Sequence, residues 1–163
     1  MQSVEHTEVA FRPARARDLP TIVRLLAEDP LGAQREKLAD PLPSGYLSAF
    51  EDIIADANQQ LVVATLADEI VGVMQLSFIP YLTYQGSWRA QIEGVRVAEA
   101  HRSRGVGRAI FEWAIARARD RGCHLVQLTT DARRPDALRF YESLGFAASH
   151  HGMKLHLDAG EST

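Results

Sequence analysis

The sequence predicts an α/β fold in which a mixed, mostly antiparallel central sheet of about seven strands carries helices on both faces. Short branched runs with strand character are interspersed with longer segments of helical periodicity. Their inferred order, β-α-α-β-β-β-α-β-α-β-β, packs naturally as one sheet between helices. The 163 residues suit a single domain (1–163), with a core at about 9–157 and a polar tail at 158–163.

The first quarter of the chain is predicted to form a strand, a helix and a loop. Residues 7–15 mix branched and aromatic side chains, and the strand ends at Pro13. Apolar residues at helical spacing predict a helix over 19–29 with Asp18 as its N-cap. Residues 30–45 are rich in proline, glycine and charge, which predicts a loop.

A second helix and a hairpin follow. The helix is predicted over residues 46–56, with Ser44 as its cap. Two strand-like runs within residues 60–79 flank Ala67-Asp68, which predicts a hairpin. The expected apolar stripe of the helix consists of Tyr46, Leu47, Phe50, Ile53 and Ile54.

The next strand leads into the segment that carries the functional argument. Residues 81–88 are predicted to form an aromatic turn, and residues 89–100 a strand. Strict alternation places one set of side chains on one face: Gln91, Glu93, Val95 and Val97. The other face then carries Ile92, Gly94 and Arg96.

The C-terminal third is predicted to add two helices and three strands. A long helix begins at a glycine-spaced turn and stops at Gly122. Residues 123–130 read as a short buried strand and 135–145 as a helix. Residues 146–157 are predicted to form a closing hairpin that turns at Gly152. The inward side of the long helix is expected to carry Ile110, Phe111, Ala114, Ile115 and Ala118.

Composition excludes several classes of protein. Hydrophobic residues make up 46% and charged residues 24%, as in an ordinary globular protein. The net charge of -3 argues against a general nucleic-acid binder, and no apolar run approaches the roughly 20 residues that span a bilayer. Cys123 is the only cysteine, so an internal disulfide is impossible. With no signal-peptide pattern, we expect a cytoplasmic protein.

The segment from Val95 to Gly122 joins a strand to a helix through a basic, glycine-spaced turn. The first turn of a helix has backbone N–H groups without intrahelical partners, and the helix dipole adds partial positive charge there. Glycines let the backbone approach a ligand, and arginines donate forked hydrogen bonds to phosphate oxygens. The turn is therefore predicted to bind an anion, and a diphosphate best of all.

Two common phosphate-binding motifs do not fit this turn. A Walker loop needs Gly-Lys-Ser/Thr, whereas Gly107 is followed by Arg108 and Ala109. A dinucleotide fingerprint needs a third glycine near the first strand, whereas Ile110 holds that position, past mid-chain.

The spacing Arg102-x-x-Gly105-x-Gly107, directly after the strand IEGVRV, resembles the coenzyme A loop of the GNAT superfamily of acyl-CoA-dependent N-acyltransferases. The later segment PDALRFYESLGF resembles that family's A-x-x-F/L-Y-x-x-x-G-F segment. The order of elements agrees with the family from about Val9 to Leu157. The resemblance implies a GNAT-like acyltransferase fold, acetyl-CoA as cosubstrate, and N-acetyltransferase activity by direct transfer to a primary amine.

The resemblance also implies how the coenzyme binds. In the family, the strand before the loop splays from its neighbour, and the pantetheine arm pairs with it like a further strand. Gly94 would allow close approach, and a backbone N–H near Val95 would hold the oxyanion. The positions implied to bind the coenzyme are Val95, Arg96, Val97, Arg102, Ser103, Arg104, Gly105, Val106, Gly107 and Arg108.

Two residues are implied to be catalytic. Tyr141 holds the place of the family tyrosine, whose phenol can protonate the departing thiolate. Alternatively, Tyr141 simply packs with Phe140 and Leu144. Glu93 is the candidate base, directly or through water, because a partly buried glutamate can accept the proton of an amine. Alternatively, Glu93 is a solvated or salt-bridged strand residue.

The chain departs from the family at one place. Many relatives have an asparagine before the tyrosine helix that contacts the pantetheine arm, whereas this chain reads TTDARRPDA. Thr130, Asp131 or Arg134 could fill that space. Arg133 and Arg134 could meet coenzyme phosphates or remain solvated.

The acceptor is expected to bind between the first two helices, their loop and the strand ends near 81–88. Carboxylates and aromatic rings suit a cationic amine. The expected partner is a small-molecule or peptide amine, with no nucleic acid or membrane, and a second copy of the chain is left open as a further partner. No metal is expected, because the histidines near the C-terminus lack a second ligand cluster. A catalytically silent acyl-CoA sensor and an unrelated phosphate-binding protein are the alternative functions. The acceptor candidates are Glu28, Asp29, Tyr46, Tyr81, Tyr84 and Trp88.

Overall fold

The computed structural model describes residues 8–157, and the elements follow the predicted order as far as the last helix. Contacts divide the chain into two compact units, one up to Leu128 and one from Thr129 onward. The first unit contains the sheet and most of the helices. The second contains α6 (Pro135–Ser143) and the segment that follows it.

A five-stranded sheet forms the centre of the first unit, in the order β1-β2-β3-β4-β5. The first four strands are antiparallel neighbours, and β5 lies parallel to β4. The sheet is therefore mixed and mostly antiparallel, as predicted, but the described residues form five strands rather than about seven. The strands are β1 (Ala10–Pro13), β2 (Gln59–Leu66), β3 (Glu69–Pro80), β4 (Trp88–Val97) and β5 (Leu125–Gln127).

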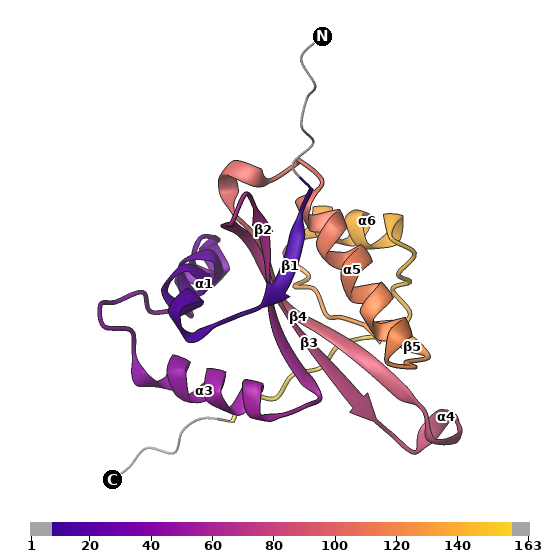
Figure 1. The fold of residues 1–163 in the computed structure, drawn as a ribbon. Coiled ribbons are helices and arrows are strands. Elements are labelled where there is room, and N and C mark those ends of the chain that lie inside the picture. Colours follow the sequence, from indigo (N-terminus) through magenta and orange to yellow (C-terminus); the bar gives the residue numbers. More distant parts are fainter. Residues whose placement is uncertain (1–7, 158–163) are drawn as a thin grey trace. The chain divides into compact units, whose positions relative to one another are not determined.

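Helices cover both faces of this sheet (Figure 1). The helices α1 (Leu19–Ala27) and α3 (Ser44–Ala55) lie on one face and α5 (Val106–Asp120) on the other. The first face is closed by Ile22, Leu25, Phe50, Val63 and Val73, among others. The buried side of α5 consists of Val106, Ile110, Phe111, Ala114 and Ala118, while the predicted Ile115 is only partly buried.

Several local predictions are confirmed where the types of one or two residues determine the backbone conformation. Ala67 and Asp68 both have positive φ, 46° and 65°, as a tight hairpin turn requires. Gly122 follows α5 with φ of 72°, and Gly145 follows α6 with φ of 94°. Both glycines end their helices in the left-handed conformation.

The predicted helix caps are confirmed only in part. Asp18 holds the N-cap position of α1, as predicted, but its carboxylate accepts the N–H of Arg15 at 2.8 Å instead of an N–H of that helix, because a 3-10 turn (η1, Ala16–Asp18) comes first. Ser44 is the first residue of α3, and Pro43 holds the cap position.

The stripe and the loop predicted around α3 were also partly wrong. Phe50 is buried, but Leu47 and Ile54 of the stripe are 47% and 61% exposed. The predicted loop over 30–45 contains the short helix α2 (Pro30–Ala33).

The closing hairpin predicted over residues 146–157 is not formed, since these residues are described without helix or strand. Met153, Leu155 and Leu157 alternate with polar residues, yet they are 93%, 87% and 87% exposed. Alternation predicts a strand only where a neighbouring strand completes the ladder, and a local pattern cannot supply that neighbour. The predicted tail, 158–163, and Thr7 lie outside the described residues. No helix in the described range is long and apolar enough to cross a membrane.

Candidate functional site

The strands β4 and β5 diverge. They pair from Arg89 with Leu125 to Gln91 with Gln127, and the pairing stops there. On its other edge β4 stays paired with β3 as far as Val97. Within residues 8–157, the edge of β4 beyond Gln91 therefore has no strand partner, and it could accept an extended ligand as an additional strand.

A β-bulge lies on this open part of β4. Between the cross-strand pairs Glu93–Gln75 and Arg96–Val73, β4 has one residue more than β3. Gly94 has φ of 60°, as the first residue of such a bulge often does. Residues paired across strands share a face. The extra residue in β4 therefore places Arg96 on the same face as Glu93, and Val97 on the opposite face. The strict alternation predicted for this strand was therefore wrong beyond Gly94.

The turn that connects β4 to α5 presents a row of backbone N–H groups. Within the described part of the chain, no backbone carbonyl accepts a hydrogen bond from the amides of residues 103–107. Ser103 and Gly105 have φ of 61° and 82°, which curls the turn, and Arg104 between them is exposed. Unpaired N–H groups at the start of a helix form an anion-binding site.

The arginines around this turn contact acidic side chains. Arg102 Nη2 lies 3.6 Å from Glu28 Oε2, and its Nε donates to the carbonyl oxygen of Val97 at 3.2 Å. Arg108 Nη1 lies 3.8 Å from Glu112 Oε1, one helical turn further on. Both pairs are at least partly exposed and contribute little stability. An incoming anion could therefore take the place of the carboxylate of Glu28 or of Glu112.

Glu93, the candidate base, is exposed on the face that carries α1 and α3. The partial burial expected of a base is therefore not found. The part of Glu93 in catalysis stays a prediction.

Tyr141, the candidate acid, lies on α6 in the second unit. Its ring centroid is 5.6 Å from that of Phe140 and 6.2 Å from that of Phe146. The neighbouring rings restrict the orientation of the phenol, in line with the packing role considered above. The acid role stays a prediction.

The segment before α6, where relatives have asparagine, contains an internal ion pair. Asp131 accepts the backbone N–H of Arg133 at 2.9 Å and a guanidinium N–H at 2.7 Å. These hydrogen bonds hold the pKa of Asp131 well below its usual range. Asp131 thus neutralises the charge of Arg133 within the same segment.

The aromatic acceptor candidates lie at the opposite end of β4, beside the turn α4 (Thr83–Gly86) (Figure 1). Tyr81 and Tyr84 place their ring centroids 5.5 and 4.7 Å from that of His124, and the hydroxyl of Tyr81 hydrogen-bonds to His124 Nε2. Trp88 begins β4. At about 3.3 Å per strand residue, this cluster is roughly 20 Å from Val95. It is too far away to bind an amine that reacts at the bulge.

The other acceptor candidates are held by local contacts. The hydroxyl of Tyr46 donates to Glu36 at 2.8 Å, and burial raises the pKa of this phenol. Glu28 contacts Arg102, and Asp29 pairs with Arg96. These two carboxylates lie beside the expected coenzyme site, a contact that the sequence did not reveal.

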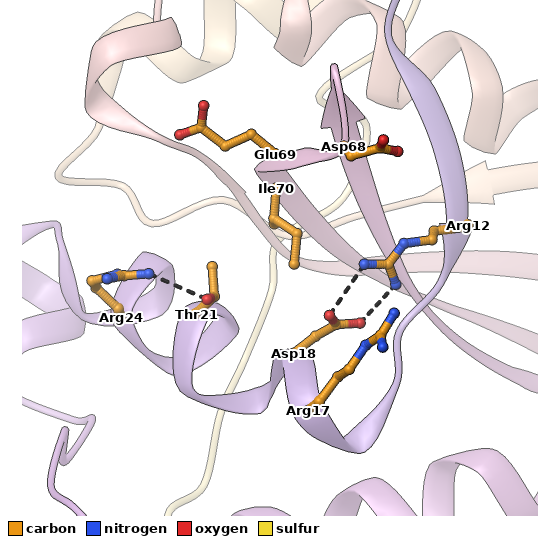
Figure 2. A pocket seen from close by; sticks show the side chains of 8 residues that line it. All are labelled: Arg12, Arg17, Asp18, Thr21, Arg24, Asp68, Glu69 and Ile70. Atoms are coloured by element: carbon orange, nitrogen blue, oxygen red, sulfur yellow. Dashed lines mark hydrogen bonds and ion pairs between the residues drawn. The ribbon is translucent and has the colours of Figure 1, made fainter.

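Two surface hollows lie away from these residues. One of about 370 Å³, at the start of α1 and the β2–β3 turn, holds a mixture of arginines and carboxylates (Figure 2). The other, of about 480 Å³, adjoins Pro20 and Leu42. Neither is lined by a residue predicted to bind coenzyme or to act in catalysis. No group of three or more histidine, cysteine, aspartate or glutamate residues in the described ranges could hold a metal ion.

Known proteins are similar to this chain in sequence and in fold. The model of the acetyltransferase (GNAT) family matches residues 20–146. A glucosamine 6-phosphate N-acetyltransferase of Trypanosoma brucei brucei is 31% identical over 142 residues, which cover 83% of this chain and 95% of that protein. An aminoalkylphosphonate N-acetyltransferase of Salmonella typhimurium is 30% identical over 105 residues, 64% of this chain and 68% of the relative. The crystal structure of a transcriptional regulator from Bacillus halodurans C-125 matches with a TM-score of 0.90 and 56% identity, covering 92% of this chain and 100% of that one.

Proposed function

The chain belongs to the acetyltransferase (GNAT) family, and we propose that it transfers an acetyl group from acetyl-CoA directly to a primary amine of a small molecule or peptide. The proposal rests on one continuous stretch of backbone within residues 8–157: the edge of β4 that lacks a strand partner there leads into the turn before α5, whose N–H groups donate to no backbone carbonyl of that range. A thioester on an amide-bearing arm needs an extended edge to pair with, and its diphosphate needs an anion site.

The coenzyme would be held in two parts. The amides of residues 103–107 would bind the diphosphate, with Arg102, Arg104 and Arg108 supplying positive charge around it. The edge of β4 from Val95 to Val97 would pair with the pantetheine arm and place the thioester at the bulge.

The transfer would then proceed through a tetrahedral intermediate. The amine nitrogen bonds to the thioester carbon, and the carbonyl electron pair moves onto oxygen, where a backbone N–H near Val95 would stabilise it. The intermediate collapses by re-forming the carbonyl and breaking the C–S bond. Tyr141 would protonate the departing sulfur, and Glu93 would take the proton that the amine loses, through water.

The properties of Cys123 support direct transfer rather than an acyl-enzyme. Its thiol is partly buried, and burial raises its pKa. A cysteine nucleophile needs the opposite shift, because the thiolate is the reactive form.

A second candidate function is a catalytically silent acyl-CoA sensor on the same fold. The 56% identical protein of Bacillus halodurans bears the name of a transcriptional regulator, which favours this candidate. Such a sensor would need the turn before α5 but neither Glu93 nor Tyr141.

Acetyl-CoA turnover with a panel of amines tests the proposal and separates the two candidates. The panel should include primary amines that carry phosphate or phosphonate, because two relatives are named for such acceptors. Release of free thiol that depends on one amine supports the enzyme. Tight coenzyme binding with no thiol release for any amine would favour the sensor.

A further inference from the structure

We propose that Asp29 and Arg96 form a positioning pair that fixes the backbone of the β4 bulge and thereby orients the N–H groups offered to the oxyanion. The catalytic half of this inference rests on the proposed function. Its structural half concerns only the order of residues 94–97. Arg96 then acts through the backbone instead of binding the coenzyme with its side chain.

Asp29 links two segments that are far apart in the sequence. Its Oδ1 accepts the N–H of Gly32 at 2.7 Å, so the residue caps α2. Its Oδ2 lies 2.9 Å from Arg96 Nε, in an ion pair rather than a directed hydrogen bond. The two side chains are 14% and 17% exposed, so water screens this pair less than a surface pair.

Arg96 transmits this restraint to the bulge. Its Nη1 donates to the carbonyl oxygen of Val95 at 2.7 Å, so the guanidinium folds back over the backbone of its own strand. The carbonyl of Val95 and the N–H of Arg96 belong to one planar peptide and point in opposite directions. Holding that carbonyl therefore fixes the orientation of this peptide plane, whose N–H faces β3, and so restrains the backbone of the bulge that precedes it.

The bulge gains from a restraint of this kind because Gly94 and Val95 have no partner in the register with β3, although Glu93 and Arg96 on either side of them are paired. The edge beyond Gln91 has no strand partner among the described residues, and the ladder with β3 is irregular at the bulge. A Cβ built on Gly94 would find its nearest neighbour, Leu26 Cδ2, only at 4.0 Å. Oxyanion stabilisation depends on donors that are oriented before the reaction begins. A polar brace from α2 would provide that orientation.

The chain contains a matched control for this pair. Asp18 likewise accepts a backbone N–H, that of Arg15, and pairs with a strand arginine, Arg12, at 2.7 Å (Figure 2). That arginine lies on β1 and not on β4. Asp18→Asn therefore removes a comparable carboxylate without touching the bulge.

The test compares Asp29→Asn with Asp18→Asn by amide hydrogen exchange and steady-state kinetics. In Asp29→Asn we expect faster exchange at residues 94–97 and a kcat lowered roughly tenfold, while the Kd for coenzyme A changes less than about threefold. In Asp18→Asn, thermal stability should fall without either effect. The double variant Asp29→Asn/Arg96→Gln should lose no more kcat than Arg96→Gln alone, because the two residues act as one unit.

Both changes are required in Asp29→Asn. Exchange at residues 94–97 equal to that of Asp18→Asn would overturn the proposal, and so would an unchanged kcat or a loss explained wholly by weaker coenzyme binding. If Asp29→Asn does not fold, Arg96→Lys keeps the charge but not the planar fork, and smaller changes of the same kind are expected. A wild-type protein that turns over no amine would count against the proposed function, while the exchange comparison would still test the brace.

Discussion

Arg102 reaches from the turn before α5 to Glu28 beyond the end of α1, with Nη2 and Oε2 3.6 Å apart. The two side chains are 46% and 27% exposed, so the pair contributes at most about 1 kcal/mol. A cation implied to bind the diphosphate is therefore partly neutralised by the chain itself. Coenzyme and Glu28 should compete for it.

This competition gives two variants opposite effects on affinity. Glu28→Gln should tighten coenzyme A binding by up to about fivefold, because it frees Arg102. Arg102→Gln should weaken binding by about tenfold, because a charge-assisted hydrogen bond is lost. Titration calorimetry measures both, and added salt should reduce both differences. Weaker binding by Glu28→Gln would show that the carboxylate helps to form the site.

Substitutions of Gly107 test whether the start of α5 binds a negatively charged group. Gly107→Asp should abolish coenzyme binding, because a carboxylate would oppose the diphosphate. Gly107→Ala is the matched control for size and should keep most of the affinity. Calorimetry with coenzyme A, ATP and NAD measures the effect, and thermal unfolding checks the fold. Unchanged affinity in a folded Gly107→Asp variant would contradict the assignment of this turn.

Tyr141→Phe separates a chemical role from packing. The ring and its contacts with Phe140 and Phe146 are kept, and only the hydroxyl is lost. If the phenol protonates sulfur, kcat should fall by about a hundredfold while the Kd for coenzyme A stays nearly constant. Equal turnover by the variant would remove Tyr141 from the mechanism.

The Arg12–Asp18 pair should make the free energy of unfolding depend on pH in the acid range. The hydrogen bond from Arg12 lowers the pKa of Asp18. Such a carboxylate stabilises the fold fully above its unfolded pKa, near 4, and loses this contribution as the pH falls through its folded value. Asp18→Asn should lower the free energy of unfolding by about 1–3 kcal/mol at pH 7, and the difference should shrink below about pH 4. A difference that persists undiminished at pH 2 in urea titrations would refute this.

The sequence predicts most reliably those features that one or two residues decide. Ala67-Asp68 and the glycines after α5 and α6 adopt the positive φ values that their types favour. The turn before α5 was found in the same way, from its glycine spacing. Gly94 was also a visible signal, since glycine within a strand often marks a bulge, but alternation was extended through it.

Features that depend on distant partners were missed. Asp29 reads as an acceptor candidate, and nothing near it in the sequence indicates that Arg96 lies 2.9 Å away. Asp18 is predicted to cap α1, but its carboxylate instead accepts hydrogen bonds from the side chain of Arg12 and the backbone N–H of Arg15. The alternation that ends at Leu157 predicts a strand, but it does not specify a neighbour to pair with.

A crystal structure of the protein with acetyl-CoA would test the central claim most directly. The account predicts diphosphate oxygens within hydrogen-bonding distance of the amides of residues 103–107, and the pantetheine arm alongside β4 from Val95 to Val97. A diphosphate bound elsewhere, with those amides facing water, would contradict it.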